Sequence, residues 1–192
     1  MLKLTLQSIR QLVVWTLITG GLYPLAMTLV AHVAFPDQAE GSLVMRDGKL
    51  VGSALIAQQF QGPKYFWPRP SAGTYATVPS GASNLGPTSA QLQTNVNNNL
   101  AALRTAHHLA ADAPVPSDLV FTSASGVDPH ISPEAARFQV SRVAAARGLA
   151  EDKVAALVEA HIEPLQWGFL GEPRVNVLLL NLALDEIDPA KK

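Results

Sequence analysis

The chain has no cysteine, few charged residues and no excess of basic over acidic side chains. Without cysteine it cannot form a disulfide, a cysteine zinc site or a thiolate nucleophile. Charged residues make up 15% of the 192 residues, whereas soluble domains average about 25%. The 14 basic residues are balanced by 15 acidic ones, so the broad basic field that nucleic-acid binding requires is missing. The composition therefore predicts a membrane-bound segment and excludes nucleic acid as a partner.

Standard nucleotide-binding and hydrolase motifs are also missing. Neither G-x-x-x-x-G-K-[ST] nor G-x-G-x-x-G occurs, so the usual backbone cradles for nucleotide phosphates are not present. No serine lies in G-x-S-x-G, and the five histidines are scattered along the chain. We therefore expect no cofactor bound through a recognisable motif, no metal site and no catalytic residue.

One long apolar segment accounts for the low charge. No residue between Arg10 and Asp37 carries a formal charge, and residues 12–35 are mainly leucine, valine, isoleucine and alanine. A bilayer core about 30 Å thick needs about 20 helical residues. The Leu, Ile, Val and Phe residues of this segment contribute on the order of −3 to −7 kcal/mol towards insertion. We expect a transmembrane helix over residues 11–35, with a cleaved signal peptide and a buried soluble helix as alternatives.

The charges that flank this helix predict its orientation. Lys3 and Arg10 precede the helix, whereas Asp37 and Glu40 follow it. Short basic flanks remain in the cytoplasm. We therefore expect a single-pass protein of the cell inner (cytoplasmic) membrane, with its N-terminus in the cytoplasm.

This orientation gives the predicted domain organisation. Residues 1–10 form a short cytoplasmic tail, residues 11–35 the transmembrane helix, and residues 36–192 one extracytoplasmic domain on the periplasmic side. The exported part keeps 12 basic and 15 acidic residues, a net charge of −3. The expected fold class is α+β.

Small residues recur along the predicted membrane helix. Thr16, Gly20, Pro24 and Thr28 are spaced by four residues, and Gly21 lies beside this stripe. Such stripes allow helices to approach closely in lipid, and a neighbouring helix can satisfy the backbone groups that a proline leaves free. We interpret these residues as a candidate contact surface for a partner helix. Ordinary membrane-helix composition is the alternative.

The first part of the exported segment is predicted to contain a hairpin and a long loop. An Asp-Gly pair between two short apolar runs indicates a hairpin over residues 42–52. Ser53 is expected to cap a short helix that ends at Phe60. Residues 62–89 are rich in proline, glycine and serine and predict a long loop, whose aromatic residues favour an ordered conformation.

The second part is predicted to contain three helices and a strand. Apolar spacing indicates helices over residues 91–110 and 152–162. A further helix is expected to begin after a Ser132 cap and to end at Gly148. The nearly continuous apolar run over residues 174–184 predicts a strand in a sheet that is buried on both faces.

A turn-rich segment over residues 123–133 contains the one cluster with potential chemistry. Asp128 and His130 are two residues apart, so the aspartate could orient the imidazole for acid–base work. The alternative, which we favour, is that Asp128 closes a turn and His130 bonds to the backbone.

Six segments of the sequence match one known family, in order, behind a single membrane helix. They are residues 52–60 (GSALIAQQF), 65–72 (YFWPRPSA), 80–88 (SGASNLGPT), 123–133 (SASGVDPHISP), 142–149 (RVAAARGL) and 171–177 (GEPRVNV). Together they closely resemble the C subunits (KdpC) of the Kdp-type high-affinity potassium-transporting ATPases of bacteria. The resemblance covers nearly the whole chain.

The resemblance implies a non-catalytic accessory subunit of a hetero-tetramer. Its implied partners are a channel-like potassium-binding subunit, a P-type ATPase catalytic subunit and a small single-helix subunit, and the complex handles ATP and potassium. Family members are also described as catalytic chaperones that raise the ATP affinity of the catalytic subunit. Because ATP is cytoplasmic and this domain is expected outside, we expect an indirect effect, coupled through the membrane helix.

Two further hypotheses concern the exported domain. It is expected to serve assembly or to cap the potassium-binding subunit rather than to attract ions, because a net charge of −3 attracts cations only weakly. Its candidate partner-contact residues are Arg69, Tyr75, Asn84, Asp128 and His130. The alternative function is a membrane-anchored periplasmic hydrolase that uses Asp128 and His130.

Overall fold

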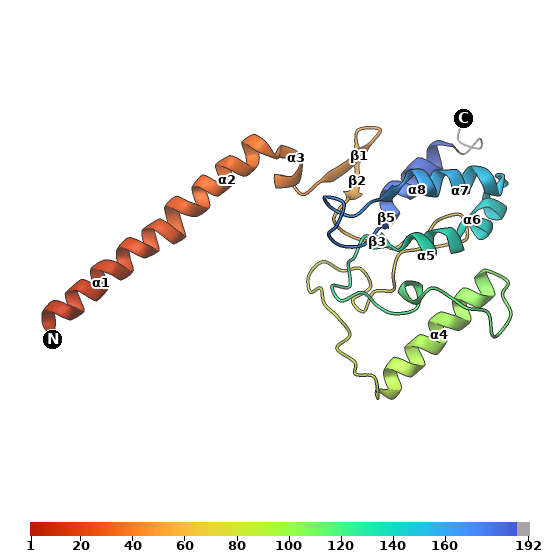
Figure 1. Ribbon diagram of the computed structural model, residues 1–192, viewed down its shortest axis with the longest axis horizontal. Coiled ribbons are helices and arrows are strands. Elements are labelled where there is room, and N and C mark those ends of the chain that lie inside the picture. Colours follow the sequence, from red (N-terminus) through yellow and green to blue (C-terminus); the bar gives the residue numbers. More distant parts are fainter. Residues whose placement is uncertain (188–192) are drawn as a thin grey trace. The chain divides into compact units, whose positions relative to one another are not determined.

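The computed structural model describes residues 1–187 and has the expected α+β class. Residues 188–192, the end of the predicted exported domain, lie outside the described residues. The chain divides into two compact units, one before and one after the boundary between Val51 and Gly52. The first contains the long apolar helix and a hairpin, and the second contains the mixed helix and sheet domain (Figure 1).

The apolar segment forms one continuous helix that begins earlier than the predicted membrane span. It consists of α1 (Leu2–Leu17), a π-helical turn η1 (Ile18–Leu22) and α2 (Tyr23–Ala34). With a mean hydropathy of 1.6 over its most apolar window, the helix is long and apolar enough to cross a membrane. Its exposed apolar side chains are those that lipid covers in a spanning helix.

The hairpin prediction is confirmed. After the short helix α3 (Pro36–Ala39), strands β1 (Leu43–Arg46) and β2 (Lys49–Ser53) form a two-stranded sheet. Asp47 and Gly48 connect the strands with φ angles of +50° and +72°. Positive φ at both central residues is the requirement of a tight hairpin turn and explains the Asp-Gly pair.

The second unit has α4 (Ala90–Ala106) and the 3₁₀ turn η2 (Ser117–Leu119), followed by four helices and three short strands. Its remaining elements are β3 (His130–Ile131), α5 (Pro133–Phe138), α6 (Val140–Arg147), α7 (Glu151–Ala160), β4 (Ile162–Glu163), β5 (Arg174–Asn176) and α8 (Val177–Glu186). The strands pair antiparallel in the order β3-β5-β4, with Val175 of β5 opposite Ile131 on one side and Ile162 on the other.

The core of this unit lies where α5, α6, α7, α8 and β5 meet. Val143, Val154, Val158, Val175 and Leu180 are fully buried there. Helix α4 adds Leu103 to the same cluster, and the loop that precedes α4 adds Phe66. The long loop is thus fixed to the core through an aromatic side chain.

The predicted C-terminal strand is wrong over most of its length. Only β5 is a strand, and the chain turns at Asn176 into α8, because the Asn176 side chain accepts a hydrogen bond from Leu179 N at 3.2 Å. Helix α8 buries residues 177, 178, 180, 181, 184 and 185, which is a helical period. A short, continuously apolar run shows neither a helical nor a strand period. The high leucine content of this run favours a helix and was a better indicator than its continuous apolar character.

Three helix predictions need correction. No helix follows Ser53, whose hydroxyl accepts a bond from Leu55 N within a turn. Helix α4 ends at Ala106 rather than at 110, because His108 takes φ +53° and the bond from Leu109 N to Arg104 O closes the end. The helix predicted over 132–148 is capped by Ser132 but divides into α5 and α6 at the buried Gln139.

Candidate functional site

The small residues of the membrane helix lie on its surface. Thr16, Gly20, Pro24 and Thr28 are exposed, and a Cβ on Gly20 or Gly21 would meet no neighbouring heavy atom within 4 Å. Packing inside this chain therefore does not require glycine at either position. Positions four apart drift by about 40° per step around an α-helix. The wider π turn over 18–22 reduces this drift and lies where the Pro24 ring would otherwise meet a carbonyl.

The loop over residues 62–89 is held to the rest of its unit by hydrogen bonds. Ser71 Oγ donates to Gly126 O at 2.5 Å and accepts from Gly73 N and Tyr75 N. Gly126 has φ +73°, and a Cβ there would lie 2.9 Å from Gly81 O. The two turn-rich segments that the sequence singled out therefore pack closely against each other.

The structure brings four of the five predicted exported residues together. Arg69 Nη1 donates to Asp128 Oδ2 at 3.2 Å, and the Tyr75 hydroxyl donates to Arg69 O at 3.0 Å. His130 N donates to Asp128 Oδ1 at 3.0 Å, and His130 Nδ1 lies 3.6 Å from the same oxygen. Asn84 is exposed with φ +54°, and its side chain is not one of this bonded group within residues 1–187.

Arg69, Asp128 and His130 line a polar groove of about 440 Å³, together with acidic side chains from neighbouring segments. Burial opposes the charge on Asp128, but the hydrogen bonds from His130 and the charge of Arg69 outweigh it and lower the pKa of the Asp128 carboxyl. A carboxylate held by an arginine and a backbone N–H is a turn-closing anion and a weak base. The turn interpretation of Asp128 is therefore the one that the geometry fits.

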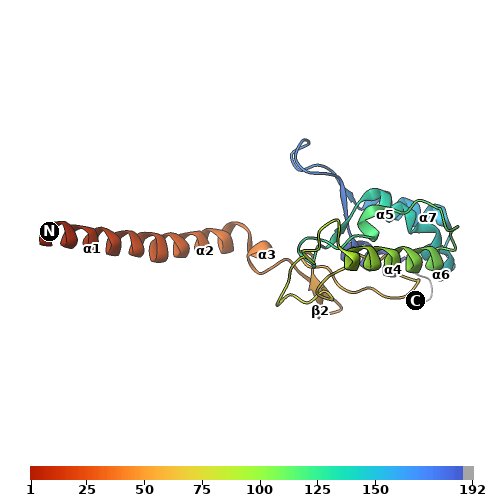
Figure 2. The ribbon, with the colours of Figure 1, turned by 90° about the horizontal axis from the view of Figure 1, so that it is seen from below.

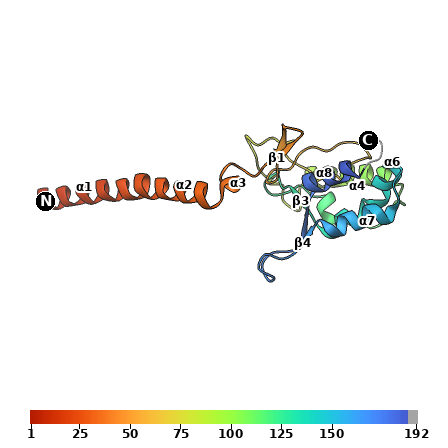
Figure 3. The ribbon, with the colours of Figure 1, turned by 90° about the horizontal axis from the view of Figure 1, so that it is seen from above.

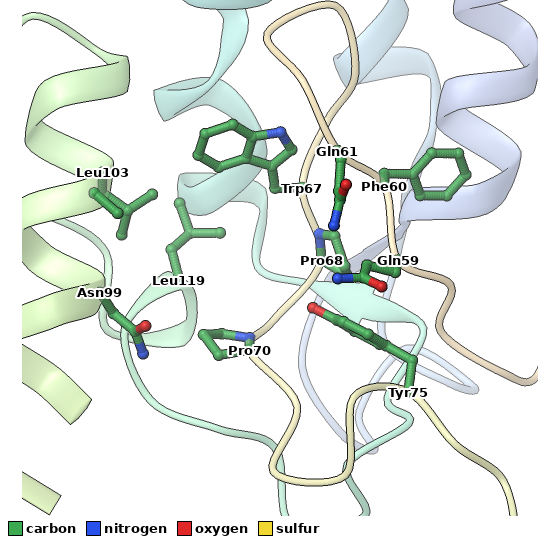
Figure 4. Close-up of a pocket in the computed structure, with 11 residues that line it drawn as sticks. Gln59, Phe60, Gln61, Trp67, Pro68, Pro70, Tyr75, Asn99, Leu103 and Leu119 are labelled. Atoms are coloured by element: carbon green, nitrogen blue, oxygen red, sulfur yellow. The ribbon is translucent and has the colours of Figure 1, made fainter.

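Tyr75 also faces a second, smaller pocket of about 210 Å³ (Figure 4). Trp67, Leu103 and Leu119 are among its apolar lining residues, and burial raises the pKa of the Tyr75 hydroxyl. The phenol is therefore a neutral donor at ordinary pH, and its hydroxyl holds the backbone of Arg69, a residue that lines the polar groove.

Sequence reasoning missed the polar residues that hold the aromatic segment Tyr65–Trp67. The buried Asn181 accepts from Phe66 N at 2.8 Å and donates to Phe66 O at 2.9 Å. The buried Gln139 accepts from Trp67 N at 2.7 Å and donates to Trp67 O at 3.1 Å. We call Gln139 and Asn181 the amide clamp, since they satisfy this backbone as a neighbouring strand would.

Two arginines also contact the Tyr65–Trp67 segment through its rings. Arg142 donates to Gln139 Oε1 and Pro63 O, both at 2.7 Å, and its guanidinium lies 4.1 Å from the centre of the Trp67 ring. Arg147 forms a buried ion pair with Asp185 at 2.8 Å and lies over the Tyr65 ring. The recognisable signal was the 142–149 segment, which the sequence marked without indicating its contacts.

His107 lies beside this network as a neutral acceptor. Arg142 Nε donates to His107 Nε2 at 3.1 Å, so that nitrogen carries no proton. Burial, with the charges of Arg142 and His108, lowers the pKa of His107 to about 4. Burial likewise lowers the pKa of Arg142 to about 10, so the guanidinium stays charged at neutral pH.

We expect the free energy of unfolding of the full-length chain to decrease as the pH is lowered from 6.5 to 4. In this window the unfolded His107 binds a proton that the folded one excludes, so stability rises with pH there and is fully present above pH 6.5. After a discount for partial exposure, the expected loss is about 1–2 kcal/mol. His107→Gln keeps a hydrogen-bond acceptor that does not titrate. The urea midpoint of this variant should therefore decrease less steeply with falling pH than that of the wild-type chain. Parallel curves for the two chains would contradict this assignment.

The comparisons with known proteins all identify the same family. The family model described as "K+-transporting ATPase, c chain" (KdpC) matches residues 5–186. A protein of Geobacter metallireducens named "Potassium-transporting ATPase KdpC subunit" is 50% identical over 186 residues, covering 95% of this chain and 97% of the relative. Proteins with the same name from Sorangium cellulosum and Burkholderia cenocepacia are 55% and 54% identical, covering 91% and 93% of this chain and 93% of each relative.

Proposed function

Since the chain belongs to the KdpC family of K+-transporting ATPase c chains, we propose that it is a non-catalytic accessory subunit of an ATP-driven potassium uptake complex. The observation that carries the proposal is a family match over residues 5–186, which includes both the apolar helix and the mixed domain. The accessory role is supported by one candidate spanning helix among residues 1–187 and by a sequence without a standard phosphate-binding motif.

The proposed orientation separates the mixed domain from ATP. Lys3 and Arg10 favour a cytoplasmic N-terminus in the inner membrane, which leaves about ten residues on the ATP side. A rise in the ATP affinity of the catalytic subunit, the chaperone role implied by the family, would then be indirect. The membrane helix would couple the two sides by favouring one state of the catalytic subunit.

The proposed partners are a channel-like potassium-binding subunit, a P-type ATPase catalytic subunit and a small single-helix subunit. In the membrane the stripe of Thr16, Gly20, Pro24 and Thr28 supports helix docking, because no contact with the described residues explains its glycine. Outside the membrane the polar groove around Arg69, Asp128 and His130 is a candidate partner contact. ATP and potassium would be bound by the complex, and this chain would hold no cofactor of its own.

The hydrolase alternative is not favoured by the geometry of the Asp128 turn. An aspartate that orients a catalytic histidine does so through a hydrogen bond from the imidazole. Here His130 Nδ1 lies 3.6 Å from Asp128 Oδ1, beyond hydrogen-bond distance, and the carboxylate instead accepts from Arg69 and from His130 N.

Co-purification from low-potassium cells tests the proposed function. The tagged full-length chain is extracted in mild detergent, its companions are identified, and ATPase activity is measured with and without potassium. We expect a P-type ATPase and a large multi-span subunit in fixed proportion to this chain, with potassium-stimulated activity. Recovery of the chain alone with its membrane helix intact, together with hydrolysis by the chain itself, would support the hydrolase instead.

A further inference from the structure

The connection between β4 and β5 exposes large apolar side chains that no described residue of its own unit covers. Trp167 is 78% exposed, Phe169 71% and Leu170 42%. Figures 2 and 3 show this connection projecting beyond the helices of the second unit, in two views that agree. We call residues 164–173 the aromatic tongue. Apolar residues gathered at one exposed place mark an interaction site more often than scattered ones do.

Backbone hydrogen bonds fix the tip of the aromatic tongue. Gln166 N donates to Leu170 O at 2.9 Å and Leu170 N donates to Gln166 O at 3.0 Å, so the tip is a closed turn. Within it Trp167 has φ +54°, which a large side chain rarely adopts. The turn therefore holds the backbone of Trp167 and Phe169 in one conformation, and little backbone freedom remains to be lost when a partner binds.

We propose that the aromatic tongue docks into an apolar pocket with a basic rim on another subunit of the complex, an inference that rests on the proposed function. Tryptophan and other aromatic residues are enriched at the energetic centres of protein interfaces. The base of the aromatic tongue is acidic, because Glu172 is exposed while Glu163 is paired with Arg174 at 2.9 Å. A pocket rim that carries lysine or arginine would complement this charge.

The same charges argue against a lipid surface or a second copy of the chain as the occupant. Loops and helices that bind a membrane surface combine aromatic with basic residues, whereas residues 164–173 contain no lysine or arginine. A second copy would present the same acidic base and no lysine or arginine in its own aromatic tongue, so it would not supply the basic rim that complements Glu172. A partner subunit with an apolar pocket is therefore the occupant that the composition of the aromatic tongue fits.

Chymotrypsin, which cuts after exposed aromatic residues, tests the proposal on the full-length chain. We expect cleavage at Trp167 or Phe169 of the chain alone in detergent, and cleavage at least about tenfold slower in the purified complex. Equal cleavage of the two would overturn the proposal. Protection of the chain alone, either in lipid vesicles or with rising chain concentration, would also overturn it, in favour of a lipid or a second copy respectively.

A double variant gives an independent readout. Trp167→Ser with Phe169→Ser should reduce the partner subunits retained after washing by about tenfold or more, with the thermal midpoint of the chain unchanged. Phe121→Ser, at an aromatic residue 45% exposed elsewhere in the unit, is the matched control and should retain them. Full retention by the double variant would overturn only the tongue proposal, whereas failure of the wild-type chain to retain any partner would overturn the proposed function as well.

Discussion

Replacing Asn181 with leucine is expected to destabilise the mixed domain by about 3 kcal/mol, because the variant leaves Phe66 N and Phe66 O buried without partners. Asn181 is 1% exposed, so water cannot replace the lost bonds. Leucine has a similar volume and adds apolar surface, and hence the measured loss reports the unsatisfied backbone rather than a cavity. The thermal midpoint of the full-length chain in detergent should fall by about 10 °C.

A matched substitution separates the amide clamp from the loss of an asparagine in general. Asn97 lies exposed on α4, so Asn97→Leu should change the unfolding free energy by less than about 0.5 kcal/mol. If Asn181→Leu and Asn97→Leu unfold at the same urea concentration, Asn181 does not hold the aromatic segment. Gln139→Leu removes the equivalent pair of bonds to the backbone of Trp67 and should destabilise the domain by a similar amount for the same reason.

Substituting Gly20 or Pro24 with leucine is expected to reduce recovery of the complex by about tenfold, because a large side chain forces the helices apart at a close approach. The folded chain itself should tolerate Gly20→Leu, since a Cβ at Gly20 would meet nothing within 4 Å in this chain. Partner subunits recovered per tagged chain measure the effect. Circular dichroism then checks that the helical content of the variant equals that of the wild-type chain, as expected if the long apolar helix persists.

The control for the stripe lies on the opposite face of the same helix. Ala26 is two residues from both Pro24 and Thr28, which places it about 200° around α2. Ala26→Leu adds the same side chain to the lipid-facing side and should leave recovery of the complex unchanged. Intact complexes from both Gly20→Leu and Pro24→Leu would show that the stripe is ordinary membrane-helix composition.

Local signals predicted those elements whose cause is local. The apolar run before Asp37 predicted the long helix, and the Asp-Gly pair predicted the hairpin, since both depend on neighbouring residues alone. The Ser132 cap was also confirmed, because its hydroxyl accepts from Ala135 N three residues later. The Asp128 turn is the same kind of short-range bond, and the sequence indicated it correctly.

The amide clamp could not be found from the sequence because its partners are far apart along the chain. Gln139 lies 72 residues from Trp67, and Asn181 lies 115 residues from Phe66. Gln139 falls in the helix predicted over 132–148 and Asn181 in the strand predicted over 174–184, and nothing near either residue indicates which backbone groups its amide meets. The predicted C-terminal strand failed for a related reason, since only the cap at Asn176 divides its apolar run into β5 and α8.

The separation between Phe66 and Asn181 also bears on how the domain reaches its folded state. A contact that closes 115 residues is entropically costly to form early, and domains dominated by such contacts fold slowly. The backbone of Phe66 gains its partner, the Asn181 side chain, only after α8 has been synthesised. During that interval the Tyr65–Trp67 segment is an exposed aromatic stretch that is prone to aggregate. The nascent chain should therefore depend most on molecular chaperones before α8 has been synthesised.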